Sequence, residues 1–282
     1  MGCTGRTSPA GKAVGVAWPG PPQAAISSIA AIESAMPVRY WLFVLLTLLL
    51  TGFIGYTTFA TARLLRTWRP ERNPLLLPAE NVVRLCLIAL CSGLGLLSGL
   101  ERSTLGWVVS RPILQVSLGI GLGTLLAGIF YVATRQLLVR TGDRFYSPLI
   151  LDLIVPDSPR EFRLILLAMA PVVLLEELLF RSLLVGGLSP LVETWLLVAA
   201  VGILFGLMHS PQGLWGMAGA GVAGICFGAI FVASGSLLLP LVAHYVANIL
   251  QIGQAMRLRR TGRLYTAGKP LPMDSSSDSG AS

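Results

Sequence analysis

Two adjacent glutamates, Glu176 and Glu177, lie in an apolar run that reads LLEELLFR from Leu174 to Arg181. Ionisable side chains are rare in such runs, because each one costs about 2.5–3.5 kcal/mol on membrane-insertion scales. Glu177 and Arg181 are four residues apart, so on a helix they share a face and can form an ion pair. Glu176 projects about 100° away from Glu177 around the helix axis. It is then left without a counter-charge, and it suits a general acid or base.

The chain contains two histidines, and each one belongs to a further pattern with a four-residue spacing. FGLMH contains Phe205 and His209, and HYVAN contains His244 and Asn248. Residues at this spacing lie on one side of a helix, so His244 and Asn248 can project into one space. Their N–H groups can stabilise an oxyanion, while a histidine together with Glu176 can activate a water molecule. These groups are sufficient to hydrolyse an amide bond.

Each pattern also has a structural explanation when it is taken alone. Glu177 and Arg181 can form a buried structural pair, and a single intramembrane histidine or asparagine can serve helix packing. The joint occurrence of two glutamates, an arginine, two histidines and an asparagine in one apolar region favours a functional site. Glu193 is close enough to the end of an apolar segment to be solvated.

The sequence lacks other common hydrolase signatures. Neither histidine belongs to an HExxH motif, and no GxSxG motif occurs. A zinc site built from a glutamate and the two histidines is an alternative, since Zn²⁺ accepts those ligands. The positive charge of Arg181 disfavours it. We therefore expect a site that uses neither a metal nor a cofactor.

The elements that carry these residues are apolar segments long enough to cross a membrane. Of the 282 residues, 54% are hydrophobic and 12% are charged, with a mean hydropathy of +0.74, which does not fit a soluble domain. We predict an all-α integral membrane protein, a bundle of about seven transmembrane helices with an intramembrane polar cavity. The seven segments cover about 40–62, 82–100, 113–133, 162–185, 191–208, 214–233 and 237–256.

Small residues recur every four positions in the sixth segment. Gly216, Ala220, Gly224 and Gly228 fall on one side of a helix, where they allow a neighbouring helix to approach closely in lipid. We expect this side to pack within the bundle, with dimerisation as the alternative.

Basic residues lie mostly between the apolar segments, and the net charge is +8. The first and third loops and the C-terminal tail carry the largest clusters, and seven spans would place all three on one side. The positive-inside rule makes this side cytoplasmic, with the N-terminus outside. Arg6, Lys12 and Arg39 count against this orientation, and an even number of spans is the alternative. We expect the basic residues to contact lipid headgroups, and we expect no nucleic-acid partner.

The two ends of the chain differ in composition from the middle. Residues 1–38 are rich in Gly, Pro, Ala and Ser without the order of a signal peptide, so we expect a disordered extension, with Met36 as an alternative start. Residues 257–282 begin with a basic cluster and continue as a low-complexity cytoplasmic tail. Between the ends we predict N-terminal helices and loops over 39–161 and a functional core over 162–256.

The three patterns occur in an order that resembles a known family. EELLFR matches EExxxR, FGLMH matches FxxxH and HYVAN matches HxxxN. The region from about 162 to 256 is similar to the CPBP family of CAAX proteases and bacteriocin-processing proteins, the Rce1-like intramembrane glutamate proteases. The resemblance implies a helical bundle with a water-accessible cavity inside the membrane.

The resemblance also implies a role for each matching residue. Glu176 and His209 activate the attacking water, and His244 and Asn248 form the oxyanion site. The remaining positions, which are Glu177, Arg181 and Phe205, support the site.

The resemblance implies an intramembrane endopeptidase that acts on a membrane-associated or lipidated peptide or protein. The family also contains members linked to bacteriocin immunity and to scaffolding, so a non-catalytic membrane partner is the alternative. A transporter or proton relay is a third hypothesis, which the absence of visible repeats disfavours. We expect membrane lipids and the membrane-associated substrate as partners, and an active site that faces the cytoplasm.

The depth of the predicted residues raises one difficulty. Glu176 follows Arg163 by thirteen residues, which is about 20 Å along a helix. This is deep for a partner of His209, which ends the next segment. Either the segment 162–185 begins later than its composition indicates, or the segment 191–208 lies tilted or sunk in the bilayer.

Overall fold

The computed structural model describes residues 36–260, except for residues 66, 69, 71 and 142–152. The chain divides into two units, Met1–Pro37 and Val38–Ser282, and the described helices belong to the second. The predicted disorder of the N-terminal extension up to residue 35 and of the tail beyond residue 260 lies outside the described residues.

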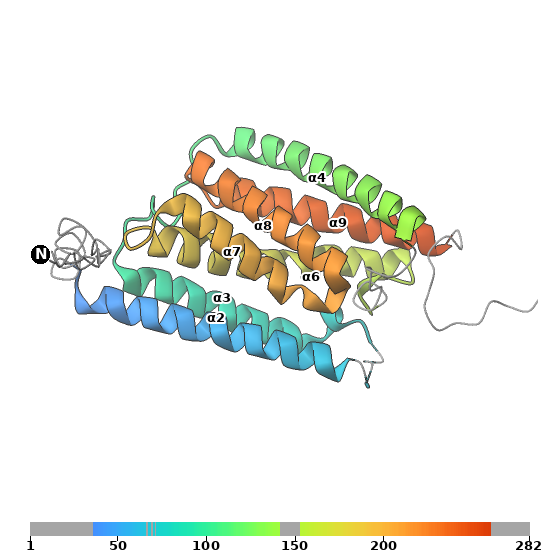
Figure 1. Ribbon diagram of the computed structural model, residues 1–282, viewed down its shortest axis with the longest axis horizontal. Coiled ribbons are helices and arrows are strands. Elements are labelled where there is room, and N and C mark those ends of the chain that lie inside the picture. Colours follow the sequence, from blue (N-terminus) through green and yellow to red (C-terminus); the bar gives the residue numbers. More distant parts are fainter. Residues whose placement is uncertain (1–35, 66, 69, 71, 142–152, 261–282) are drawn as a thin grey trace, which may run out of the picture. The chain divides into compact units, whose positions relative to one another are not determined.

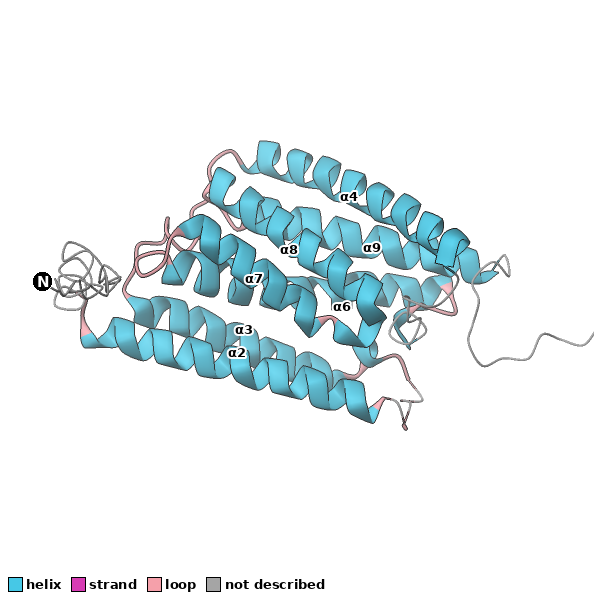
Figure 2. Cartoon of the chain, in the orientation of Figure 1, coloured by secondary structure: helices cyan, strands magenta, loops and turns pink. Residues whose placement is uncertain are grey.

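Helices account for all of the regular structure in the described residues, as Figure 2 shows. Two short 3₁₀ helices, η1 (Pro74–Leu76) and η4 (Ser210–Gln212), and one π-helix, η3 (Leu178–Gly186), accompany seven α-helices. This confirms the predicted all-α class and the seven apolar segments. The α-helices are α2 (Val38–Leu64), α3 (Pro78–Ser98), α4 (Pro112–Thr141), α6 (Pro159–Glu177), α7 (Thr194–Met208), α8 (Gly213–Ser234) and α9 (Leu238–Arg260).

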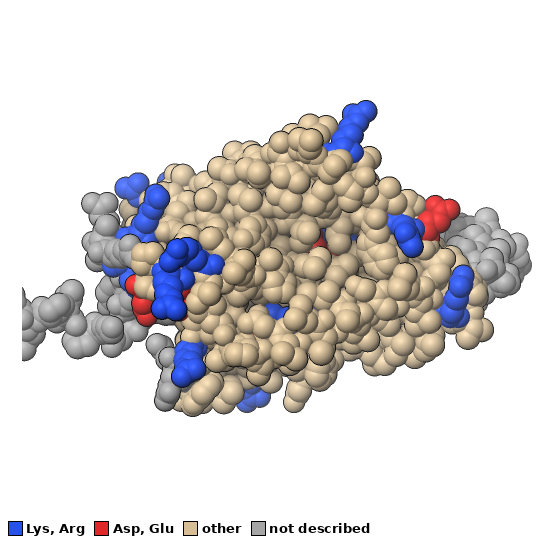
Figure 3. Space-filling model, turned by 180° about the vertical axis from the view of Figure 1, so that it is seen from behind, with Lys and Arg blue, Asp and Glu red and all other residues tan. Residues whose placement is uncertain are grey.

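Four helical segments in the described part are long and apolar enough to cross a membrane: α2, α3, α4 and Ser210–Ser234. Large hydrophobic side chains such as Leu49 and Phe53 remain about 60% exposed, as expected for side chains that face lipid. In the view of Figure 3, most Lys and Arg side chains lie toward the two ends of the bundle, and the surface between them is almost uncharged. The chain is therefore an all-α membrane protein.

Helix α7 is shorter than the others that carry site residues. Its 15 residues span about 22 Å, against about 30 Å for the hydrocarbon layer. The side chain of Glu193 caps its N-terminus by accepting the N–H of Leu196 at 2.8 Å. Hydrogen bonds from the backbone of Trp195 and Leu196 lower the pKa of the Glu193 carboxyl. Helix α6 begins at residue 159, earlier than predicted, so a late start of this segment does not resolve the depth difficulty.

The helices pair closely where small residues meet. Figure 1 shows α2 beside α3, α4 beside α9 and α7 beside α8, in agreement with their contacts. A Cβ atom on Gly224 of α8 would lie 3.1 Å from the Cα of Gly202 on α7, and one on Gly228 would lie 3.0 Å from Val198. The small-residue side of α8 therefore packs within the bundle, as predicted.

Two connections fold back into the helical bundle. Leu75 of η1 is buried in one core cluster with Ile165, Met169, Val173 and Ile252. On the connection between α3 and α4, Leu105 is only 1% exposed.

The connection that carries Leu105 is hydrogen-bonded to η3 and to the residue that precedes α9. The backbone oxygen of Leu105 accepts the Ser182 hydroxyl at 2.8 Å, and that of Gly106 accepts the Leu237 N–H at 2.8 Å. This connection therefore covers one end of the helices that carry the predicted site.

Gly106 and Gly235 provide a matched test of this connection. Both have a positive φ, +72° and +61°, which strains any residue with a Cβ atom by about 1–2 kcal/mol. A Cβ on Gly106 would also collide with the ring of Phe231, whereas nothing lies within 4 Å of one on Gly235. We expect Gly106→Ala to lower the thermal unfolding midpoint in detergent micelles clearly more than Gly235→Ala. Equal midpoints would show that the connection is not held tightly.

Candidate active site

The backbone changes from an α-helix to a π-helix directly after the two glutamates. The Leu178 N–H contacts the carbonyl oxygens of both Leu174 and Leu175, and the segment Leu178–Gly186 then continues as a π-helix whose nine residues are all buried. π-helical turns are rare and are frequent at functional sites. The sequence did not predict this change, because no residue type marks it.

Glu177 and Arg181 form a buried ion pair, as their spacing predicted. Arg181 Nη1 lies 3.2 Å from Glu177 Oε1, and their side chains are 1% and 0% exposed. Arg181 Nη2 also donates to the backbone oxygen of Gly224 at 3.3 Å, which ties η3 to α8. The guanidinium carbon lies 4.9 Å from the ring centre of Phe205 and 5.5 Å from that of Phe227. These cation–π contacts and the ion pair hold the charge where no water reaches it.

His244 of α9 lies between the two glutamates of α6. Its Nδ1 atom is 2.7 Å from Glu177 Oε1, and its Nε2 atom is 3.4 Å from Glu176 Oε2. The ring of Phe227 stacks on the imidazole, with a centroid distance of 4.7 Å and an interplanar angle of 22°. The sequence predicted that His244 and Asn248 share one side of a helix, but it did not predict that His244 contacts both glutamates. The angle of about 100° between Glu176 and Glu177 around the helix axis had suggested that Glu176 points away from the residues that contact Glu177.

These contacts assign the hydrogen-bond direction at His244. Glu177 Oε1 lies against the permanent charge of Arg181, so this carboxylate acts as an acceptor and the Nδ1–H of His244 donates to it. The Nε2 atom then faces Glu176 Oε2, at a distance of 3.4 Å. Glu176 is 27% exposed, whereas Glu177 is fully buried, so of the two carboxylates only Glu176 is accessible.

His209 caps the C-terminus of α7, and the ring of Phe205 lies between it and His244. Its Nδ1 atom lies 2.7 Å from the backbone oxygen of Phe205. A carbonyl oxygen only accepts, so Nδ1 carries a proton, and in the neutral imidazole Nε2 has the lone pair. The Phe205 ring contacts both histidines, at centroid distances of 4.5 Å to His209 and 5.9 Å to His244.

The structure does not join every predicted site residue directly. Asn248 Nδ2 donates to the sulfur of Met169 at 3.8 Å. Neither His209 nor Asn248 hydrogen-bonds to Glu176 in the part of the chain that the structure describes. Their roles in water activation and oxyanion binding stay predictions.

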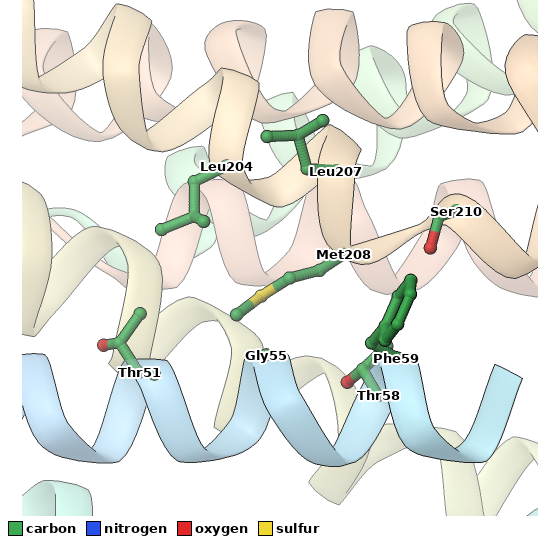
Figure 4. A pocket seen from close by; sticks show the side chains of 9 residues that line it. Thr51, Gly55, Thr58, Phe59, Leu204, Leu207, Met208 and Ser210 are labelled. Carbon is green, nitrogen blue, oxygen red and sulfur yellow. The ribbon is translucent and has the colours of Figure 1, made fainter. Parts of the chain in front are cut away.

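A cavity of about 260 Å³ lies between α2 and the C-terminal end of α7, lined by Met208 and Ser210 on either side of His209 in the sequence but not by Glu176. Figure 4 shows Met208 reaching toward Gly55 across this space, with Phe59 close to Ser210. Its lining is mostly apolar, so it is not the polar cavity expected at the site, which stays a prediction.

The donor set gives the zinc alternative no support. Among the described residues, no group of three or more His, Cys, Asp or Glu side chains has an arrangement that can hold a metal ion. Glu176, Glu177 and His244 are linked instead by direct contacts to one another.

Residues 158–250 match one family model, whose description is "Rce1-like: Type II CAAX prenyl endopeptidase Rce1-like". The match begins at the N-cap of α6 and ends within α9, and it covers about a third of the chain. No curated protein and no solved structure matches the chain. The matched segment contains all seven predicted site residues: Glu176, Glu177, Arg181, Phe205, His209, His244 and Asn248.

Proposed function

We propose, from the match of residues 158–250 to the Rce1-like family model, that the protein is an intramembrane endopeptidase. It hydrolyses a peptide bond in a membrane-associated or lipidated substrate. The observation that carries this proposal is the imidazole of His244 held between two carboxylates, one buried and paired, the other accessible. Such a set can hold, accept and return a proton inside a membrane.

In the proposed reaction, the Glu176 carboxylate takes a proton from a water molecule, with His209 Nε2 as the second acceptor on that water. The water oxygen attacks the carbonyl carbon of the substrate, and the carbonyl electron pair moves to its oxygen. Asn248 Nδ2–H and a protonated His244 Nε2–H donate to this oxyanion. The oxyanion then collapses, the C–N bond breaks, and the amine nitrogen takes the proton from Glu176.

Glu177 and Arg181 are positioning residues in this scheme. Glu177 accepts the Nδ1–H of His244, which orients the imidazole and stabilises it in the protonated form, as a buried carboxylate does for a catalytic histidine. Arg181 balances the Glu177 charge, so that Glu176 is left to react with water.

We also propose that the site opens toward the cytoplasm. The connection that contains Leu105 covers the end formed by η3, α8 and α9. Among the described residues, Arg63, Arg140, Arg160 and Arg257 lie near the opposite ends of α2, α4, α6 and α9. These ends face the cytoplasm under the positive-inside rule.

The experiment uses the purified full chain in sealed lipid vesicles, with fluorogenic peptides that are anchored to lipid. We expect cleavage when peptides are offered to the cytoplasmic face, and the same rate after treatment with a chelator. His209→Asn keeps a donor for the Phe205 carbonyl but has no basic nitrogen, so we expect kcat/KM to fall by about 10²-fold or more. Cut sites are identified by mass spectrometry.

The possible outcomes separate the hypotheses. A rate that chelation removes and zinc restores would favour the metal alternative. Wild-type rates in His209→Asn would remove the role of this residue in water activation. If the wild type cleaves no peptide but complements a deletion strain, and the His244→Ala variant complements it equally well, the scaffold function is the correct one.

A further inference from the structure

We propose that the cavity between α2 and the C-terminal end of α7 binds an anionic phospholipid, whose acyl chain fills the cavity and whose phosphate binds Arg63. This inference goes beyond the proposed peptidase function and does not depend on it. Five of the nine residues that line the cavity belong to α2, outside the segment 158–250 that matches the family model. The matched segment alone therefore does not form the site.

The cavity is much larger than an ordinary packing gap. Its volume is about 260 Å³, many times that of a water molecule, which is about 30 Å³ in the liquid. Proteins contain few empty spaces larger than a water molecule, because the atoms around such a space lose dispersion contacts. A hollow of this size between two packed helices therefore requires an occupant.

The walls of the cavity match a hydrocarbon chain. Leu204 and Met208 line it from α7, and Gly55 leaves room on α2, where an added Cβ atom would lie 3.1 Å from Met208 Cε (Figure 4). Phe59 and Leu207 line it from the two helices and are 58% and 54% exposed, so the cavity is open to the surrounding lipid. Apolar hollows stay free of water. An acyl chain is the occupant that a bilayer supplies.

Polar groups follow the apolar part of the cavity in the order of the parts of a phospholipid. The Thr51 hydroxyl lies farthest from the end of α2 and already donates to the Thr47 backbone oxygen at 2.8 Å. Thr58 and Ser210 also line the cavity, and their hydroxyls hydrogen-bond to none of the described residues. These two hydroxyls are placed to donate to the ester oxygens of a glycerol backbone.

Arg63 supplies the charge that selects an anionic headgroup. It follows Thr58 by five residues, about 8 Å along the axis, in the last turn of α2. Its side chain is exposed and forms no ion pair with the described residues. The stem of an arginine lies along apolar surface while its guanidinium reaches the headgroups, where it binds phosphate through parallel hydrogen bonds. A lipid phosphate therefore complements this charge.

The bound lipid contacts the residues on both sides of His209. Met208 and Ser210 line the cavity, and α2 packs directly against η4, which begins at Ser210. A chain in the cavity fills the space between these elements, so it stabilises their packing. In the proposed orientation Arg63 faces the cytoplasmic leaflet, which is rich in anionic lipids.

The test uses the full chain in phosphatidylcholine vesicles with about one fifth phosphatidylglycerol as the anionic lipid. The probe is phosphatidylglycerol with a photoreactive diazirine in one acyl chain, and labelled residues are mapped by mass spectrometry. A phosphatidylcholine probe of the same chain length reports ordinary contact with lipid. We expect the anionic probe to label residues 51–59 and 204–210 about fivefold more, which is the preference that one arginine provides.

Four variants separate the cavity and the charge from general effects. Gly55→Leu fills the cavity and should remove the preferential labelling, whereas Gly128→Leu adds the same side chain at an exposed position of α4 and should retain it. Arg63→Gln keeps the cavity but should bring the two probes to equal labelling. Arg140→Gln, which removes an exposed arginine from the last turn of α4, should leave the preference unchanged.

Thermal unfolding provides a second readout. A ligand that binds only the folded chain raises its unfolding midpoint. We expect added phosphatidylglycerol to raise the midpoint of the wild type in detergent micelles, and to raise that of Gly55→Leu and Arg63→Gln clearly less. If Gly55→Leu does not fold, Gly52→Leu replaces it, because Gly52 lines the cavity and nothing lies within 4 Å of an added Cβ atom.

Three results would overturn the proposal. The first is equal labelling of the wild type by both probes, and the second is an unchanged preference in Gly55→Leu and Arg63→Gln. The third is displacement of the anionic probe by a lipidated peptide more readily than by unlabelled phosphatidylglycerol, since the cavity then holds the lipid anchor of a substrate. Neither readout requires peptidase activity, so a wild type that cleaves no peptide contradicts the proposed function alone.

Discussion

Replacement of Glu176 by glutamine is expected to lower kcat/KM for peptide cleavage by about 10³-fold, the usual contribution of a general acid or base. Glutamine preserves the size of the side chain and can still donate to His244, but it cannot take a proton from water. Glu176 is the accessible member of the glutamate pair, so no other carboxylate at this site is placed to replace it. The measurement is the initial rate of cleavage of a lipid-anchored peptide.

Two matched variants make the Glu176 result specific. Glu101→Gln removes an exposed carboxylate from the connection between α3 and α4, and it should leave the rate unchanged. Glu176→Asp keeps the acid but withdraws it from His244, so its rate should fall between those of Glu176→Gln and the wild type. Wild-type rates in Glu176→Gln would refute the proposed mechanism.

Replacement of Arg181 by methionine is expected to have the largest effect on folding, about 3–5 kcal/mol in the free energy of unfolding. This change leaves Glu177, which is fully buried, without its cation. It also removes the contact to the Gly224 carbonyl, which joins η3 to α8. Reversible unfolding in mixed micelles, followed by circular dichroism, measures the loss.

The double variant Glu177→Gln/Arg181→Met separates the unpaired charge from lost packing. A buried ion pair that is replaced by neutral residues of similar volume is often neutral in stability. We therefore expect the double variant to regain most of the loss. Arg163→Met, which removes an exposed arginine from α6, the helix that precedes η3, serves as the control. If Arg181→Met is as stable as Arg163→Met, the pair contributes little to the fold.

The positions of the helices could be predicted from the sequence because each helix is marked by a run of apolar residues within its own segment. Runs of apolar residues predicted all seven α-helices, and the misplaced boundaries have identifiable causes. Helix α6 starts at residue 159 because the Ser158 hydroxyl caps it and proline suits the first helical position. Helices α4 and α9 extend to residues 141 and 260, beyond the apolar runs, because arginine is a good helix former.

The contacts of the site did not follow from the sequence because they depend on distant segments. The four-residue spacing gave the pair between Glu177 and Arg181, which lie close in sequence on either side of the junction between α6 and η3. The contact of His244 with Glu177 joins residues 67 positions apart. The π-helix could not be predicted, because no residue type in the sequence distinguishes it from an α-helix.

The short helix α7 determines how far water must travel into the bilayer. A helix about 8 Å shorter than the hydrocarbon layer brings one polar end below the level of the surrounding headgroups, or else draws the lipid surface toward it. His209 is the residue at that end. If the proposed function holds, water reaches the site over a shorter depth at this end, and hydrolysis needs no pore across the membrane.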